Sequence, residues 1–211
     1  MENRRDLSSR DIGFFQKMGG TLVKLGLTPN QISVMSVVFA ALSAYGFYHL
    51  SPDSSNVWLY WFLAFAGIQM RLFCNLIDGL MAIEGGKKTP AGEIFNDFPD
   101  RISDVIIILG ASLAIPYVWG KDLGWVASVL AVFTAYIRVL GAAMGKGHDF
   151  RGPMAKQHRM FILNVTLVAW MIEYYFTHTN YALVSGMCVV AVGSLFTIIN
   201  RLRVLVGKLN S

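Results

Sequence analysis

Charged residues and cysteines are both scarce in this chain of 211 residues. Only 15% of the residues are charged while 55% are hydrophobic, and the mean hydropathy is +0.50. Soluble domains average about 25% charged and about 45–50% apolar residues, so a soluble enzyme and a disordered chain are both excluded. The two cysteines, Cys74 and Cys188, lie far apart within apolar segments, which excludes a disulfide-stabilised scaffold. The sequence also lacks a G-x-S-x-G nucleophile motif and a histidine pair at metal-binding spacing.

Long apolar segments are abundant instead. Several reach the roughly 20 residues needed to cross a bilayer, and short loops separate them. We predict an all-α integral membrane protein with six transmembrane helices, at about 31–50, 56–83, 92–116, 122–145, 157–177 and 181–205. Basic and apolar residues recur at helical spacing within residues 1–30, which predicts an amphipathic helix on the membrane surface. Residues 31–211 then form one six-helix domain.

The distribution of lysine and arginine predicts how the chain is oriented. Nearly all of these residues outside the apolar segments lie at the two termini and in the second and fourth loops, whereas Lys121 alone lies on the opposite side. The positive-inside rule therefore places both termini in the cytoplasm. The net charge of +5 comes from residues that flank apolar segments and do not form one basic face. We accordingly predict contact with membrane lipids and no nucleic-acid partner.

A group of polar side chains interrupts the second and third expected helices. Asn75 and Asp78 share one face of the second helix, and Asn96, Asp100 and Asp104 share one face of the third. Only a short loop joins the two helices, so the polar faces are neighbours near the cytoplasmic side. Charges inside a membrane cost about 2.5–3.5 kcal/mol each and so require a reason. Carboxylate and amide oxygens facing one another predict a site for a hard cation such as Mg²⁺.

Ion pairing offers a second interpretation of the same charges. Asp97 and Asp104 lie four and three residues from Arg101, so both can pair with it and hold the helices together. Too few arginines are available there to balance all the aspartates, which favours the cation site. Pro99 removes a helical hydrogen bond beside Asp100 and predicts a kink next to the site.

The spacing of these polar residues is that of a known motif. The segment 75-NLIDGLMAIEGGKKTPAGEIFNDFPD-100 resembles the signature of the CDP-alcohol phosphatidyltransferases, D-x-x-D-G-x-x-A-R, eight residues, G-x-x-x-D-x-x-x-D. Every spacing matches without a gap. The segment 28-TPNQIS-33 before the first long helix is also similar to that family. Three positions depart from the signature, because Asn75 and Asn96 replace aspartates and Ile83 replaces the arginine.

The resemblance implies roles for the matching residues. The family binds two divalent metals, Mg²⁺ or Mn²⁺, and its last aspartate activates the acceptor hydroxyl. By position, Asp100 is implied as metal ligand and catalytic base. The other implied metal ligands are Asp78, Asn75 and Asn96, with Asp104 as an additional carboxylate on the same face. The implied nucleotide-binding residues are Asp78, Gly79, Ala82, Gly92 and Asn30. Because the motif carries only two carboxylates, we predict one tight metal and a second that arrives with the nucleotide.

A basic loop between the fourth and fifth expected helices is the second feature. The stretch 146-KGHDFRGPMAKQHR-159 resembles that of family members whose acceptor is a phosphorylated polyol. The resemblance implies acceptor binding by Arg151, Lys156 and Arg159, with Arg138 from the preceding helix, since arginine suits phosphate. The positive-inside rule and attraction to anionic lipids explain the same charges without any acceptor, so both interpretations stay open.

These features predict a membrane phosphotransferase. It would move a phosphatidyl group from CDP-diacylglycerol to a small polar alcohol, phosphorylated or not, and release CMP, as a step in phospholipid biosynthesis. The resemblance further implies a homodimer in the cytoplasmic membrane, with its active site on the cytoplasmic side. The alternative is an inactive relative that binds nucleotide or lipid without turnover, and Asn75, Asn96 and Ile83 favour it. A transporter is less consistent, because the carboxylates cluster near one side and no symmetric pair of broken helices is visible.

Overall fold

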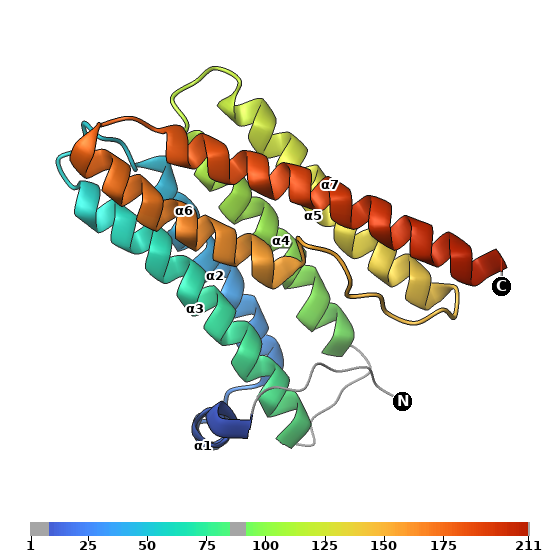
Figure 1. The fold of residues 1–211 in the computed structure, drawn as a ribbon. Helices are drawn as coiled ribbons and strands as arrows, with labels where there is room; N and C mark the ends of the chain where they lie inside the picture. Colours follow the sequence, from blue (N-terminus) through green and yellow to red (C-terminus); the bar gives the residue numbers. More distant parts are fainter. Residues whose placement is uncertain (1–8, 85–91, 211) are drawn as a thin grey trace.

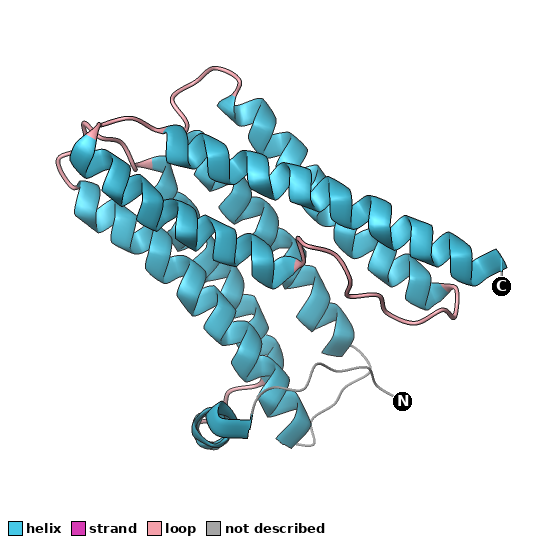
Figure 2. Ribbon diagram, in the orientation of Figure 1, coloured by secondary structure: helices cyan, strands magenta, loops and turns pink. Residues whose placement is uncertain are grey.

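The computed structural model describes residues 9–84 and 92–210, and this part of the chain is helical with no strand (Figure 2). It contains seven helices: α1 (Ser9–Lys24), α2 (Pro29–Tyr48), α3 (Val57–Glu84), α4 (Gly92–Leu113), α5 (Gly120–Ala143), α6 (Lys156–Phe176) and α7 (Tyr181–Asn210). The all-α class predicted from the sequence is confirmed. The six long helices begin and end within a few residues of the predicted bounds, α7 excepted, which continues to Asn210.

The long helices run lengthwise in one bundle, while α1 crosses its end beside α3 (Figure 1). Helix α2 packs against α3 and α4, α5 packs against α4 and α7, and α6 packs against α7 and α3. Four helices, α2, α3, α5 and α7, are long and apolar enough to cross a membrane. The length and composition of these helices indicate a multi-pass membrane protein. Six spans, cytoplasmic termini and a domain boundary at residue 30 stay predictions.

The start of α2 is fixed by local chemistry. The Thr28 hydroxyl accepts a hydrogen bond from the Gln31 backbone N–H, and the Gln31 side chain accepts one from the Thr28 N–H. Pro29 follows at the first helical position, where its missing N–H costs nothing. Gly26, with φ of 84°, ends the preceding turn. This geometry sets the rotation of α2 and places Ser33 on its buried face.

Small residues let the helices approach closely. A Cβ on Gly67 of α3 would lie 2.6 Å from the Ser43 backbone nitrogen, and one on Gly110 of α4 would lie 2.6 Å from the Ala44 Cα. Such contacts drive helix association in membranes, where lipid is as apolar as the side chains. Helix α2 is thus held tightly between α3 and α4, which carry the polar cluster.

The loop between α5 and α6 is tied down onto α7. Gly152 has φ of 116°, and a Cβ there would lie 2.5 Å from a Thr197 methyl carbon. The Thr197 hydroxyl accepts the Met154 N–H at 2.9 Å, and the Arg201 guanidinium donates to the Arg151 carbonyl at 2.8 Å. The basic loop therefore has a defined course, and it ends where the first turn of α6 packs beside α4.

Candidate active site

The polar cluster lies between the second half of α3, the first half of α4 and the first turn of α6, which begins beside the middle of α4 (Figure 1). Asp78 and Asp100 are both buried there, with 4% and 3% of their surface exposed. Each is within electrostatic reach of the other and of Lys156. The structure thus brings together the two motif carboxylates and one predicted acceptor-binding cation.

Asp78 has one bonded and one open carboxylate oxygen. Its Oδ2 accepts a hydrogen bond from the Ser33 hydroxyl at 2.5 Å. Its Oδ1 is buried and has no hydrogen-bond partner within the described ranges. One turn earlier on α3, the Asn75 side-chain nitrogen is likewise buried without a partner in the same ranges. An open carboxylate oxygen beside an open amide is an arrangement that can ligate a cation, since the amide can turn its oxygen inward.

Asp100 differs because cations face both of its oxygens. Arg71 Nη2 lies 3.3 Å from Oδ1, and the Lys156 ammonium donates to Oδ2. Arg101 Nη2 lies 3.7 Å from the same Oδ2. Helices α3, α4 and α6 each supply one of these cations, so the charge of Asp100 is neutralised by the chain itself.

Asp104 lies one turn further along α4, between two buried arginines. Its Oδ1 is 2.7 Å from Arg71 Nη2, and its Oδ2 is 2.5 Å from Arg159 Nη2. Arg159 also donates to the Thr134 hydroxyl at 3.1 Å and to the Met154 carbonyl at 2.8 Å. This geometry resembles the ion-pairing interpretation of the sequence, although the main partners are Arg71 and Arg159. Arg101 is 4.0 Å from Asp104, at the outer limit of an ion pair.

The residues present fit one divalent cation better than two. Within residues 9–84 and 92–210, no three His, Cys, Asp or Glu side chains gather as a metal site. The open donors are Asp78 Oδ1 and the Asn75 amide, whereas Asn96 is exposed on α4. The metal roles of Asn96, Asp100 and Asp104 stay predictions.

The residues predicted to bind the nucleotide line the same end of the bundle. A Cβ on Gly79 would meet no atom within 4 Å, so the space beside it is open. Gly92 and Asn30 are half-buried at the first turns of α4 and α2. Ala82 belongs to α3, but its side chain lies outside the described residues. Their nucleotide role stays a prediction.

The four cations predicted for the acceptor have different surroundings. Arg151 is exposed and lies 3.5 Å from Asp149, and Arg138 pairs with Asp97. The other two are already engaged in the bundle, Lys156 by Asp100 and Arg159 by Asp104. Because Asp149 and Asp97 are more exposed than Asp100 and Asp104, Arg151 and Arg138 are the better candidates for binding an incoming anion. All four acceptor roles stay predictions.

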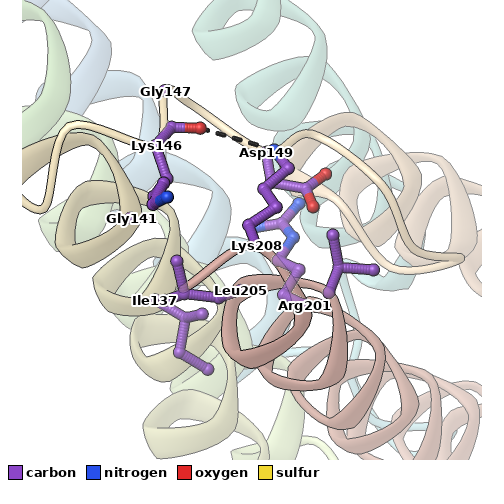
Figure 3. Close-up of a pocket in the computed structure, with 9 residues that line it drawn as sticks. Ile137, Gly141, Lys146, Gly147, Asp149, Arg201, Leu205 and Lys208 are labelled. Carbon is purple, nitrogen blue, oxygen red and sulfur yellow. Dashed lines mark hydrogen bonds between the residues drawn. The ribbon is translucent and has the colours of Figure 1, made fainter. Parts of the chain in front are cut away.

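A small hollow lies between the basic loop and α7 (Figure 3). Asp149 and Arg201 line it, and Lys208 donates to the Lys146 carbonyl at 3.4 Å across it. Its free volume is about 10 Å³, which is room for about one water molecule. The hollow therefore belongs to the attachment of the loop, and a phosphate group does not fit in it.

A larger groove opens between α3 and α6. It holds about 580 Å³ and runs from the site end of both helices toward the middle of the bundle. Its lining is mostly apolar, with a few amides: Phe65, Gln69, Leu72, Leu76, Gln157, Phe161, Asn164, Val165 and Val168. The Asn164 oxygen is buried without a partner among the described residues.

Two residues of the site were not assigned from the sequence. Ser33 bonds Asp78, and Arg71 bonds both Asp100 and Asp104. Arg71 lies inside an apolar segment. Placing a charge within a membrane costs free energy, and this cost alone indicates a functional or structural role. Ser33 is the last residue of the 28-TPNQIS-33 segment, but a serine in an apolar helix carries no comparable signal.

Fold and site together define a helical membrane protein with a buried pair of carboxylates at one end of its bundle. The chain belongs to the CDP-alcohol phosphatidyltransferase family, whose model matches residues 26–199. This is a transferase family of phospholipid biosynthesis.

Curated relatives support the assignment at low identity. An archaetidylinositol phosphate synthase of Pyrococcus horikoshii is 25% identical over 148 residues, which are 70% of this chain and 73% of the relative. A phosphatidylinositol phosphate synthase of Mycobacterium tuberculosis is 26% identical over 186 residues, covering 86% and 81% of the two chains.

Solved structures show the same fold. The crystal structure of Mycobacterium tuberculosis phosphatidylinositol phosphate synthase with CDP-DAG bound superposes with a TM-score of 0.74 at 22% identity, over 92% of this chain and 94% of that one. The structure of that protein with manganese and citrate gives a TM-score of 0.71 at 22% identity, over 90% and 88% of the two chains.

Proposed function

We propose that this chain transfers a phosphatidyl group from CDP-diacylglycerol to a small phosphorylated alcohol and releases CMP. The proposal is supported most by the buried carboxylates of Asp78 and Asp100. They lie on α3 and α4 at the spacing of the family motif, and the chain belongs to that family. The relatives that synthesise inositol-phosphate lipids support inositol phosphate as the acceptor class. We extend the proposal to six spans with both termini in the cytoplasm of a cell membrane and to a homodimer.

The donor lipid would bind with its head group at the bundle end and its tail in the membrane. Gly79 leaves open space for the nucleotide, and the groove between α3 and α6 begins beside the site and offers an apolar surface for one acyl chain. A donor bound this way keeps its tail in lipid while the reacting phosphate reaches Asp78. A bound Mg²⁺ or Mn²⁺ would neutralise the diphosphate.

Asp100 would take the proton of the acceptor hydroxyl. A carboxylate offers about four lone-pair sites, so Oδ2 can accept from Lys156 and from a hydroxyl together. Arg71 fixes the other oxygen and so sets the direction of the remaining lone pairs. Arg151 and Arg138 would hold the acceptor phosphate, because phosphate can replace Asp97 as partner of Arg138.

CMP release by the purified protein in lipid nanodiscs tests the proposal. CDP-diacylglycerol, Mn²⁺ or Mg²⁺ and a pool of polyol phosphates are supplied, with the Asp100→Asn variant beside the wild type. Metal-dependent CMP that is lost in the variant and requires an acceptor supports the transferase. An Asp122→Asn variant is the control, since this aspartate is exposed in the first turn of α5, away from the site, and should retain turnover.

Non-catalytic binding is the second candidate function. Asn75, Asn96 and Ile83 replace motif residues, and both oxygens of Asp100 already face cations. CDP-diacylglycerol binding without any CMP release, with every acceptor in the pool, would favour this function over the transferase.

A further inference from the structure

The charges around the two buried carboxylates are unevenly shared. The Asp100 oxygens face Arg71 and Lys156, whereas Asp78 Oδ1 has no hydrogen-bond partner in the part of the chain that is described. The Ser33 hydroxyl that bonds the other Asp78 oxygen is neutral. Among the described residues, the first carboxylate thus faces two cations, whereas the second bonds a neutral hydroxyl through one oxygen and has its other oxygen open.

Lys156 reaches Asp100 because of how α6 begins. It is the first residue of that helix, and only 26% of its side chain is exposed. The backbone just before it is fixed by the hydrogen bond from Met154 to Thr197, and the helix just after it is fixed by the pair between Arg159 and Asp104. The backbone of Lys156 is therefore anchored on both sides, at a place from which its ammonium reaches Asp100.

Charge balance limits how many divalent cations the site can hold. Two of them would set four positive charges against Asp78 and Asp100, and Asp100 already faces Lys156 and Arg71. A single divalent cation at Asp78 leaves a smaller imbalance. The Asn75 amide, whose nitrogen has no partner within the described ranges, supplies a neutral ligand one turn away. Amide oxygens add no negative charge, so the asparagines suit one cation and not a pair.

We propose that Lys156 is the resident cation of the site: its ammonium neutralises Asp100 and excludes a second divalent metal, so that the chain binds one metal, at Asp78 and Asn75, before any nucleotide arrives. This inference rests on the proposed function only for the use of that metal in catalysis. Lys156 then has a role distinct from the acceptor phosphate, which is left to Arg151 and Arg138.

The number of Mn²⁺ ions bound per chain tests the proposal directly and needs no substrate. Isothermal titration gives the number of Mn²⁺ ions per chain, and electron paramagnetic resonance detects the coupling between two ions about 3.5–4 Å apart. The protein in nanodiscs is titrated with Mn²⁺ alone. We expect one uncoupled ion in the wild type.

Variants separate the contribution of Lys156 from that of the asparagines. Asn75→Asp with Asn96→Asp restores four motif carboxylates but keeps Lys156, and we expect it still to bind one ion. Adding Lys156→Met should raise the number to two, with a coupled spectrum. Lys146→Met, which removes an exposed lysine at the start of the same loop, is the control and should leave one ion.

Several results would overturn the inference. They are two coupled ions or none in the wild type, two ions in the Asn75→Asp, Asn96→Asp variant, or one ion after Lys156 is also removed. The wild-type and double-variant titrations decide the matter even where the triple variant does not fold. Because no donor lipid is used, a chain that binds one Mn²⁺ but releases no CMP would refute the proposed transferase and leave this inference intact.

Discussion

Replacing Asp104 by asparagine tests whether this residue is a counter-ion or a metal ligand. Its two oxygens bind Arg71 and Arg159, and all three side chains are at most 2% exposed. Asparagine keeps the size and one acceptor oxygen but removes the charge. Arg159 then loses its one carboxylate partner among the described residues, and Arg71 keeps only the longer contact to Asp100.

The expected loss of stability is large because the pair is buried. Removing one partner of a buried ion pair costs about 3–5 kcal/mol, since the other charge stays out of water. In a chain of this length, 1 kcal/mol corresponds to about 2–4 °C in Tm, so Asp104→Asn should lower the Tm by about 6–20 °C. Asp97→Asn is the control: its side chain is 37% exposed, and exposed pairs contribute about 1 kcal/mol or less.

Thermal unfolding in detergent micelles with EDTA is the assay. Absence of divalent metal is essential, because a counter-ion stabilises the protein without metal whereas a metal ligand does not. An Asp104→Asn protein that unfolds at the wild-type temperature in EDTA, and differs only when Mn²⁺ is added, would refute the argument.

Three further substitutions test other contacts. Glu173→Ala should cost about 1–2 kcal/mol of unfolding free energy in thermal melts, because this carboxylate accepts two backbone N–H groups at the start of α7; a Tm equal to the wild type would contradict it. Gly186→Ala should cost about 1–3 kcal/mol in the same assay, since its Cβ would lie 1.9 Å from a threonine hydroxyl, whereas Gly20→Ala, with no atom within 4 Å, should be neutral. Ser33→Ala should change Mn²⁺ affinity in a calorimetric titration, because it frees the second oxygen of Asp78; unchanged affinity would argue against a metal at that carboxylate.

The helices could be predicted from the sequence because their signals are local. Apolar length, Thr28 with Pro29, and Gly26 fix where helices begin and end, and the predicted segment 56–83 differs from α3 by one residue at each end. The end of the third long helix was predicted at 116, but α4 ends at Leu113. Pro116 disfavours helix at the residue before it, which explains an earlier stop.

The partners inside the site could not be predicted in the same way. Spacing along one helix pairs Asp104 with Arg101, which are three residues apart. The structure gives Asp104 the closer partner Arg159, 55 residues away. That choice depends on how α6 is rotated against α4, which is set by packing between helices and leaves no periodic signal in the sequence.

The same buried pair constrains how the protein is made. Helix α4 carries five charged residues among its first thirteen, and it is not among the four described helices apolar enough to cross a membrane alone. Asp104 finds Arg159 only after α5 and the following loop have been synthesised. We therefore expect α4 to stay at the membrane surface or in the translocation machinery until α6 emerges, so that insertion of this segment is a late event in biogenesis although it lies near the middle of the chain.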